Sequence, residues 1–307
     1  MHGMSLDRRR FGIALTVVAG ASIVGWGWLK LASQHRTAEM LATPEGRRAL
    51  FDQAEADVRP KEGFQSRIAL KDTVSRLIEE RVLDPRKFIS LYDRPGGIPP
   101  AVRYLLKWPS HNPILLTAET ATAYVNLLWP LGLANRMTTN EQSPINTVSL
   151  PNFASTAGWW LGAEANGAAY FNKLPIVALT PEQEALATRV AKTTFRPCCN
   201  NSTFYQDCNH GSALLGLLEL GASQGLTEDE LYREALGFNS FWFPDTYVKT
   251  ALYFRIFERR DWRDVDPKLV MGHDFSAIGP WRRNVEARIK TIPDLIPEPA
   301  AGAKCGV

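Results

Sequence analysis

The longest uncharged apolar run of the chain extends from Phe11 to Leu29 and follows three consecutive arginines at positions 8–10. A helix of this length measures about 28 Å, close to the thickness of the hydrocarbon core of a bilayer. The arginines favour a cytoplasmic N-terminus, and Trp26 and Trp28 lie near the far end, where tryptophan rings favour the membrane interface. We therefore predict an export signal and single-pass membrane anchor over residues 1–36. It contacts the lipid bilayer of an inner (cytoplasmic) membrane through residues 11–29 and leaves the C-terminal domain on the periplasmic, extracytoplasmic side.

The start of this run, Arg8-Arg9-Arg10-Phe11, is similar to a twin-arginine export signal, in which two arginines and one further residue precede phenylalanine. Asp7 stands where that signal usually has Ser or Thr, and no Lys follows Phe11. That export route carries proteins that are already folded. The segment Leu31-Ala32-Ser33 is a poor match to a small-x-small cleavage site, so we expect the helix to be retained as an anchor.

Beyond residue 36 the pattern of polar and apolar positions predicts a mainly α fold, in which a helical globular domain with irregular loops follows the membrane helix. Residues 37–65 are mostly polar and predict a stalk in front of a domain over residues 66–307. Apolar residues at three- and four-residue steps between Ile68 and Val82 predict an amphipathic helix. Proline, capping-box and periodicity signals predict further helices at 85–91, 117–129, 180–194, 227–238, from 244 onward and at 280–290. Proline at position 130 is expected to end the helix that begins at 117.

Charge is distributed unevenly along the chain. The formal net charge is +3, of which residues 1–36 contribute +4, so the remainder carries about −1. A nearly neutral body without a basic stripe argues against nucleic acid as a partner. The content of hydrophobic residues, 45%, is typical of a globular protein rather than a disordered one. No protein partner is indicated.

Three of the four cysteines and one of the five histidines lie within residues 198–210: Cys198, Cys199, Cys208 and His210. The almost wholly apolar residues 212–220 that follow predict a buried helix. Residues 207–210 are therefore expected at its N-terminus, where the helix dipole and free N–H groups stabilise a thiolate. The predicted helix over 180–194 brings the other two cysteines from the opposite side. We predict that these four residues form one metal site.

Thiolates and an imidazole suit Zn²⁺, Cu⁺ or an iron–sulfur cluster. The spacing of the cysteines matches neither zinc fingers nor ferredoxins, and there is no C-x-x-C-H motif for haem. The predicted metal ion is copper or zinc, and copper fits the neighbouring thiols and the compartment best by elimination. The sequence therefore predicts a membrane-anchored extracytoplasmic protein that binds or transfers a soft metal ion.

Two other interpretations of the cysteines stay open. Outside the cytoplasm, cysteines often form disulfides. Cys198 or Cys199 can join Cys208, and the remaining cysteine can reach Cys305, which would give a structural or partner-binding domain. Alternatively, the same pair can serve an exported thiol–disulfide oxidoreductase, so whether the protein is an enzyme is left open and no catalytic residue is assigned.

Two further signals lie outside this cluster. His273 lies in a predicted loop and offers an additional metal ligand. The G-x-S-x-G pattern at residues 221–225 is not interpreted as a hydrolase motif, because that motif requires a strand before the serine and here a helix precedes it. Gly225 is expected to end that helix.

Overall fold

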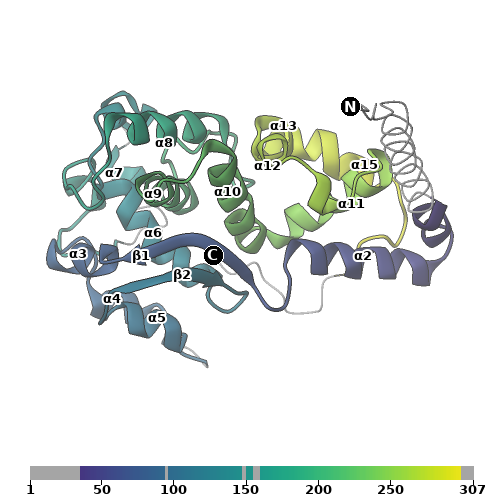
Figure 1. The fold of residues 1–307 in the computed structure, drawn as a ribbon. Helices are drawn as coiled ribbons and strands as arrows, with labels where there is room; N and C mark the ends of the chain where they lie inside the picture. Colours follow the sequence, from purple (N-terminus) through teal and green to yellow (C-terminus); the bar gives the residue numbers. More distant parts are fainter. Residues whose placement is uncertain (1–34, 94–95, 147–149, 155–159, 299–307) are drawn as a thin grey trace, which may run out of the picture.

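The computed structural model describes residues 35–93, 96–146, 150–154 and 160–298 (Figure 1). The predicted anchor over residues 11–29 and Cys305 lie outside these ranges. The described chain is mainly helical, as the sequence predicts, with one sheet of two strands. Within the described ranges, no helix combines the length and the apolar character that crossing a membrane requires.

Two buried helices, α6 (Ala121–Ala134) and α9 (Asn209–Ser223), pack side by side in the centre of the fold. They approach so closely that a Cβ atom on Gly132 would lie 1.9 Å from the backbone oxygen of Ser212. The prediction that Pro130 ends α6 is wrong, because the helix continues through this residue. Proline costs a helix one hydrogen bond, and burial of α6 on all sides stabilises the helix despite that loss.

Helices α8 (Pro181–Thr193) and α10 (Glu228–Trp242) pack against this pair, and α11 (Pro244–Phe257) packs against α10 and α2 (Pro44–Val58). Both predicted capping boxes are present, at Thr180 with Gln183 and at Thr227 with Glu230, so these helix starts are confirmed. Shorter helices complete the fold: α3 (Thr73–Glu79), α4 (Pro85–Ser90), α5 (Pro100–Leu105), α7 (Leu150–Phe153), α12 (Pro267–Met271), α13 (His273–Ser276), α14 (Ile278–Trp281) and α15 (Ala287–Ile289).

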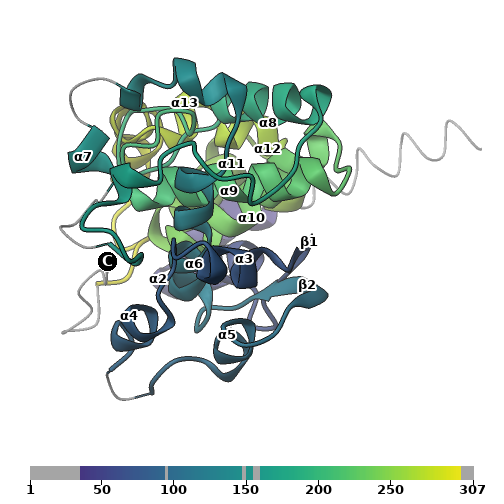
Figure 2. The same ribbon diagram turned by 90° about the vertical axis from the view of Figure 1, so that its left-hand side faces the viewer.

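The sheet pairs β1 (Phe64–Lys71) with β2 (Ser110–Leu116) in antiparallel fashion. Helices α9 and α10 lie on one side of it and α4 and α5 on the other (Figures 1 and 2). The predicted helix from Ile68 to Val82 is wrong in its first part, which is β1, and correct for α3. Ile68 and Leu70 fit the period of a strand as well as that of a helix, and pairing with β2 decides between them.

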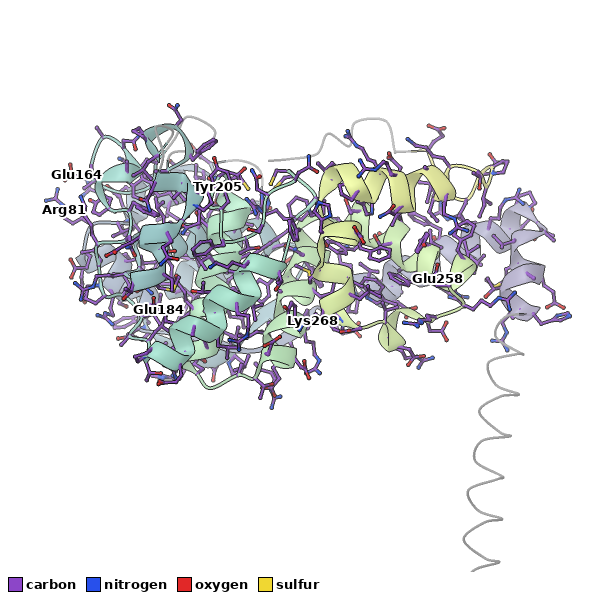
Figure 3. All side chains as sticks on the ribbon, turned by 90° about the horizontal axis from the view of Figure 1, so that it is seen from above. Arg81, Glu164, Glu184, Tyr205, Glu258 and Lys268 are labelled. Carbon is purple, nitrogen blue, oxygen red and sulfur yellow. The ribbon has the colours of Figure 1, made fainter. Side chains whose placement is uncertain are left out.

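Residues 37–65, predicted as a polar stalk, contain a helix that contacts the rest of the described chain. Residues 44–58 form α2 (Pro44–Val58), which packs against α11 (Figure 1). Leu50, Ala54 and Val58 are spaced by four residues and form a narrow buried stripe on an otherwise polar helix. This part of the chain therefore belongs to the globular body. Charged side chains such as Arg81, Glu164 and Glu258 project from the outer surface of that body (Figure 3).

Candidate metal centre

The loop between α8 and α9 folds back on itself and carries two of the cysteines on a turn. Phe195 and Ser202 form an antiparallel bridge, and the Thr203 amide donates to the Thr194 carbonyl at 2.9 Å. The hydroxyl groups of these two threonines, both fully buried, are hydrogen-bonded at 3.0 Å. Cys198 and Cys199 lie on the turn that this pairing closes, and the chain then returns to the start of α9.

This arrangement brings together three of the four predicted ligands. The ligand atoms of Cys198, Cys208 and His210 lie within 4.8 Å of one another, and the two sulfur atoms are 3.5 Å apart. Two sulfur ligands of one tetrahedral zinc ion are about 3.8 Å apart when each Zn–S bond is about 2.3 Å. The three side chains can therefore hold a metal ion. Cys198 is exposed, whereas Cys208 and His210 are half-buried.

The imidazole of His210 is held by aromatic side chains of neighbouring elements. Its ring centre lies 4.5 Å from that of Phe243 and 5.9 Å from that of Trp242, at the junction of α10 and α11. These contacts restrict the ring on the side facing the helices. The candidate site is thus bordered by an aromatic wall and by the cysteine loop.

Cys199 lies beside the group but is not one of its three members. Its Sγ atom is 3.9 Å from the Asn201 carbonyl oxygen and 3.9 Å from Oδ1 of Asp207. The participation of Cys199 in metal binding stays a prediction. His273 packs its ring against Phe195 at 5.2 Å and is not among the three clustered donors.

Cys208 forms the N-cap of α9, which confirms the predicted position at the start of the buried helix. Its extended backbone places Sγ where it accepts a hydrogen bond from the Gly211 amide at 3.4 Å. A cysteine side chain therefore replaces the oxygen that usually caps a helix, and the free N–H of the first turn points at the sulfur.

Arg196 is the residue of this site that the sequence analysis missed. Its side chain is fully buried, and its Nε atom donates to the sulfur of Cys208 at 3.2 Å. The remaining donors bind the carbonyl oxygens of Asn201, Ser202 and Tyr205 and the carboxylate of Asp207. All five N–H groups of the guanidinium thus have an acceptor.

The fit around this guanidinium is tight. A Cβ atom on Gly211 would lie 2.6 Å from Cζ of Arg196, so only glycine leaves enough room at this position. The signal in the sequence is that Arg196 is the single cationic residue between Thr194 and Gly211, a run that holds three thiols and a carboxylate.

These contacts set the charge of the cluster. Hydrogen bonds from the thiols of Cys198 and Cys199 lower the pKa of Cys208 well below its usual range, and the positive charge of Arg196 acts in the same direction. Hydrogen bonds to Cys199 and Cys208 raise the pKa of Cys198. Of these thiols, Cys208, which lies beside Arg196, is therefore the one that loses its proton most readily, and Cys198 is the one that keeps its proton.

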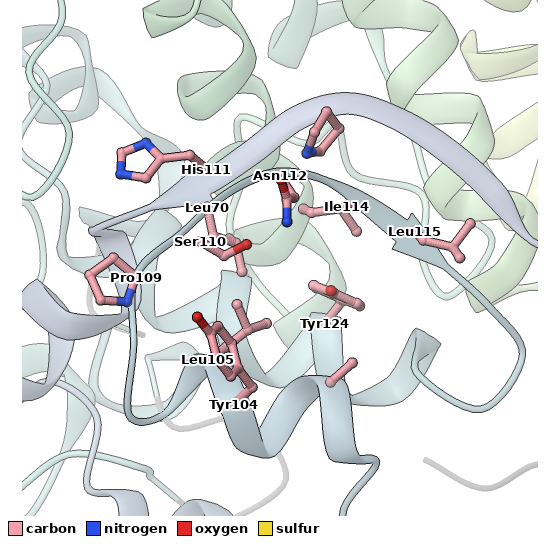
Figure 4. Close-up of a pocket in the computed structure, with 12 residues that line it drawn as sticks. Leu70, Tyr104, Leu105, Pro109, Ser110, His111, Asn112, Ile114, Leu115 and Tyr124 are labelled. Atoms are coloured by element: carbon pink, nitrogen blue, oxygen red, sulfur yellow. The ribbon is translucent and has the colours of Figure 1, made fainter.

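Two other features of the described chain lack the donors of a metal site. A hollow of about 400 Å³ lies between β2 and α5, lined by residues that include Tyr104, His111 and Leu115 (Figure 4). Neither a cysteine nor a carboxylate lines it. Ser223, the serine of the G-x-S-x-G pattern, ends α9 and donates to the Leu220 carbonyl, and Gly225 follows with a φ of 82°, as predicted for the glycine after a helix.

Comparison of the chain with protein-family models, curated proteins and solved structures finds no match.

Proposed function

We propose that this protein binds a soft metal ion, zinc or copper, on the extracytoplasmic side of a membrane to which residues 11–29 anchor it, and that it stores the ion or passes it on. The observation that carries the proposal is the convergence of Cys198, Cys208 and His210, whose ligand atoms lie within 4.8 Å of one another. Sulfur and imidazole donors select soft and borderline ions.

The charges around the site support a divalent ion. Arg196 and Asp207 cancel, and the thiolates of Cys208 and, once it loses its proton, Cys198 contribute two negative charges. A divalent ion such as Zn²⁺ makes this partly buried cluster neutral, which lowers the cost of burying charge. Cu⁺ satisfies the preference for sulfur and leaves one negative charge. An iron–sulfur cluster is less favoured, because such clusters are usually held by four cysteines.

The exposure of Cys198 supports exchange of the ion with other molecules. A ligand at the surface can be replaced by an incoming thiol without opening the fold, whereas structural zinc sites are usually closed by four protein ligands. Transfer of the ion is therefore the form of metal binding that the position of the site favours.

Equilibrium dialysis against Zn²⁺, and against Cu⁺ without air, tests the proposal. We expect about one ion per wild-type chain, and loss of nearly all binding in Cys208→Ser, because one of three ligands is removed. His210→Ala should weaken binding without unfolding the protein. Cys305→Ser is the matched control and should bind as the wild type does. Equal metal occupancy in Cys208→Ser and the wild type would refute the proposal.

A second candidate function is thiol–disulfide exchange, and it rests on the lowered pKa of Cys208 beside the sulfur of Cys198. A thiolate next to a second thiol is the arrangement that such enzymes use. The exposed partner here is Cys198, whose pKa is raised, so the more nucleophilic sulfur is the less accessible one. Reduction of an insulin disulfide by the metal-free protein would favour this candidate.

The membrane topology is tested separately. A reporter that is active only outside the cytoplasm, fused after residue 307, should be active. Arg8→Lys combined with Arg9→Lys should block export if the twin-arginine route is used. A cytoplasmic reporter that is active at the same fusion point would contradict the topology without bearing on the metal site.

A further inference from the structure

We infer that an ion bound by Cys198, Cys208 and His210 keeps a fourth coordination position that faces solvent and takes a small thiol. The inference rests on the proposed metal binding and names the class of ligand through which the ion would be exchanged.

The described residues place three donors around the site and no fourth one. No other histidine, cysteine or carboxylate of the described ranges joins the group within the same 4.8 Å. Zn²⁺ and ions like it take four ligands, and sites with three protein ligands complete their shell from solution. A tetrahedral ion held here is therefore one ligand short.

Cys199 is the residue that could fill this position. Its thiol interacts with those of Cys198 and Cys208, but its sulfur is not within 4.8 Å of all three donors. Its backbone oxygen accepts a hydrogen bond from the Ile278 amide at 3.0 Å, which ties the turn to α14. Its sulfur faces Asn201 and Asp207, and the carboxylate of Asp207 is itself fixed by Arg196.

The direction in which the fourth coordination position opens follows from the residues that cover the three ligands. The guanidinium of Arg196 contacts Cys208 from the buried side, and aromatic rings of Trp242 and Phe243 cover His210. Cys198 is the exposed member. The fourth position therefore opens next to Cys198, towards solvent.

A thiol suits this position better than a hard oxygen ligand, because two thiolates already select a soft ion. An entering thiol would give its proton to solvent and bind the ion through sulfur in place of a water ligand. No electron is transferred. When the thiol belongs to an acceptor, the same step begins the transfer of the ion.

The test uses the full chain, purified in detergent and loaded with Co²⁺ in place of the natural ion, with 2-mercaptoethanol as the probe. We expect saturable growth of the sulfur-to-cobalt absorption by about half, since two thiolate ligands become three. Bound cobalt, measured by dialysis, should stay constant. Cys199→Ser should behave like the wild type before and after the probe is added.

The possible failures are distinguishable. If Cys199→Ser loses about a third of the sulfur-to-cobalt absorption and the wild type does not respond to the probe, Cys199 is the fourth ligand and the inference is wrong. If the wild type binds cobalt and only fails to respond to the thiol, the open position is again refuted while metal binding stands. Failure of the wild type to bind cobalt, zinc or copper refutes the proposed function and the inference with it.

Discussion

Replacement of Arg196 by methionine removes a buried cation from the centre of the cysteine loop while roughly keeping the length of the side chain. Five acceptors lose their donor: the sulfur of Cys208, the carboxylate of Asp207 and three backbone carbonyls. We expect the metal-free protein to lose a large part of its stability and the pKa of Cys208 to rise.

The size of this loss of stability depends on which acceptors are left without a hydrogen-bond donor. The carbonyls of Ser202 and Tyr205 keep backbone hydrogen bonds, from the amides of Tyr205 and Asp207. The main cost is therefore the pair of negative charges at Asp207 and Cys208, which are left without a cation. Breaking a buried ion pair from one side costs about 3–5 kcal/mol, and we expect the free energy of unfolding to fall by about this amount rather than by the sum over five bonds.

Denaturation by urea, followed by circular dichroism, measures this loss. Arg196→Lys keeps the charge but offers three donors from a compact group, so it should recover only part of the stability. Arg189→Met is the matched control, because the ion pair of Arg189 with Glu228 is largely exposed and such pairs contribute about 0–1 kcal/mol. A change below about 1 kcal/mol in Arg196→Met would refute the assigned role of this guanidinium.

Three further predictions concern packing and titration. Gly132→Ala should destabilise the protein by roughly 2 kcal/mol or more, because the new methyl group would meet the Ser212 carbonyl. A thermal midpoint equal to that of the wild type would contradict the close packing of α6 on α9. Burial raises the pKa of Glu219 well above its usual range, and this effect exceeds the opposite effect of the neighbouring Asn135 side chain. The free energy of unfolding of the wild type should therefore fall as pH rises from about 4.3, by up to roughly 1.4 kcal/mol per pH unit. Glu219→Gln should be the more stable protein at neutral pH. Equal pH dependence of the two proteins would be evidence against the buried carboxyl. In the metal-free protein, the ultraviolet absorbance of thiolate should show one thiol titrating well below about pH 8.5. The stability that this Cys208 thiolate contributes should be complete above that pH and be lost as pH falls through its lowered pKa. A protein in which no thiol titrates below about pH 8.5 would contradict the assignment.

The sequence predicts those parts of the fold whose signals are local. The capping boxes at Thr180 and Thr227 each satisfy free N–H groups within four residues, so they mark helix starts whatever surrounds them. The position of Cys208 and His210 at the start of α9 follows in the same way from the apolar residues after them. The convergence of Cys198 with Cys208 also needs the pairing of Thr194 with Thr203, which folds the loop back on itself.

The parts of the fold and of the site that the sequence does not predict depend on contacts between distant segments. Ile68 and Leu70 become a strand because β2, more than forty residues away, pairs with them. The stripe of α2 is recognised as buried only when α11 covers it. Arg196 has no local pattern that marks it as buried, since its acceptors are gathered by the pairing of Thr194 with Thr203 across the turn.

The most direct test of the metal centre is the elemental analysis and native mass of the protein purified without exposure to air. We expect one zinc or copper ion per chain, with Cys198, Cys199 and Cys208 recovered as free thiols once the ion is removed. A metal-free protein in which Cys208 is joined to Cys198 or Cys199 by a disulfide would contradict it.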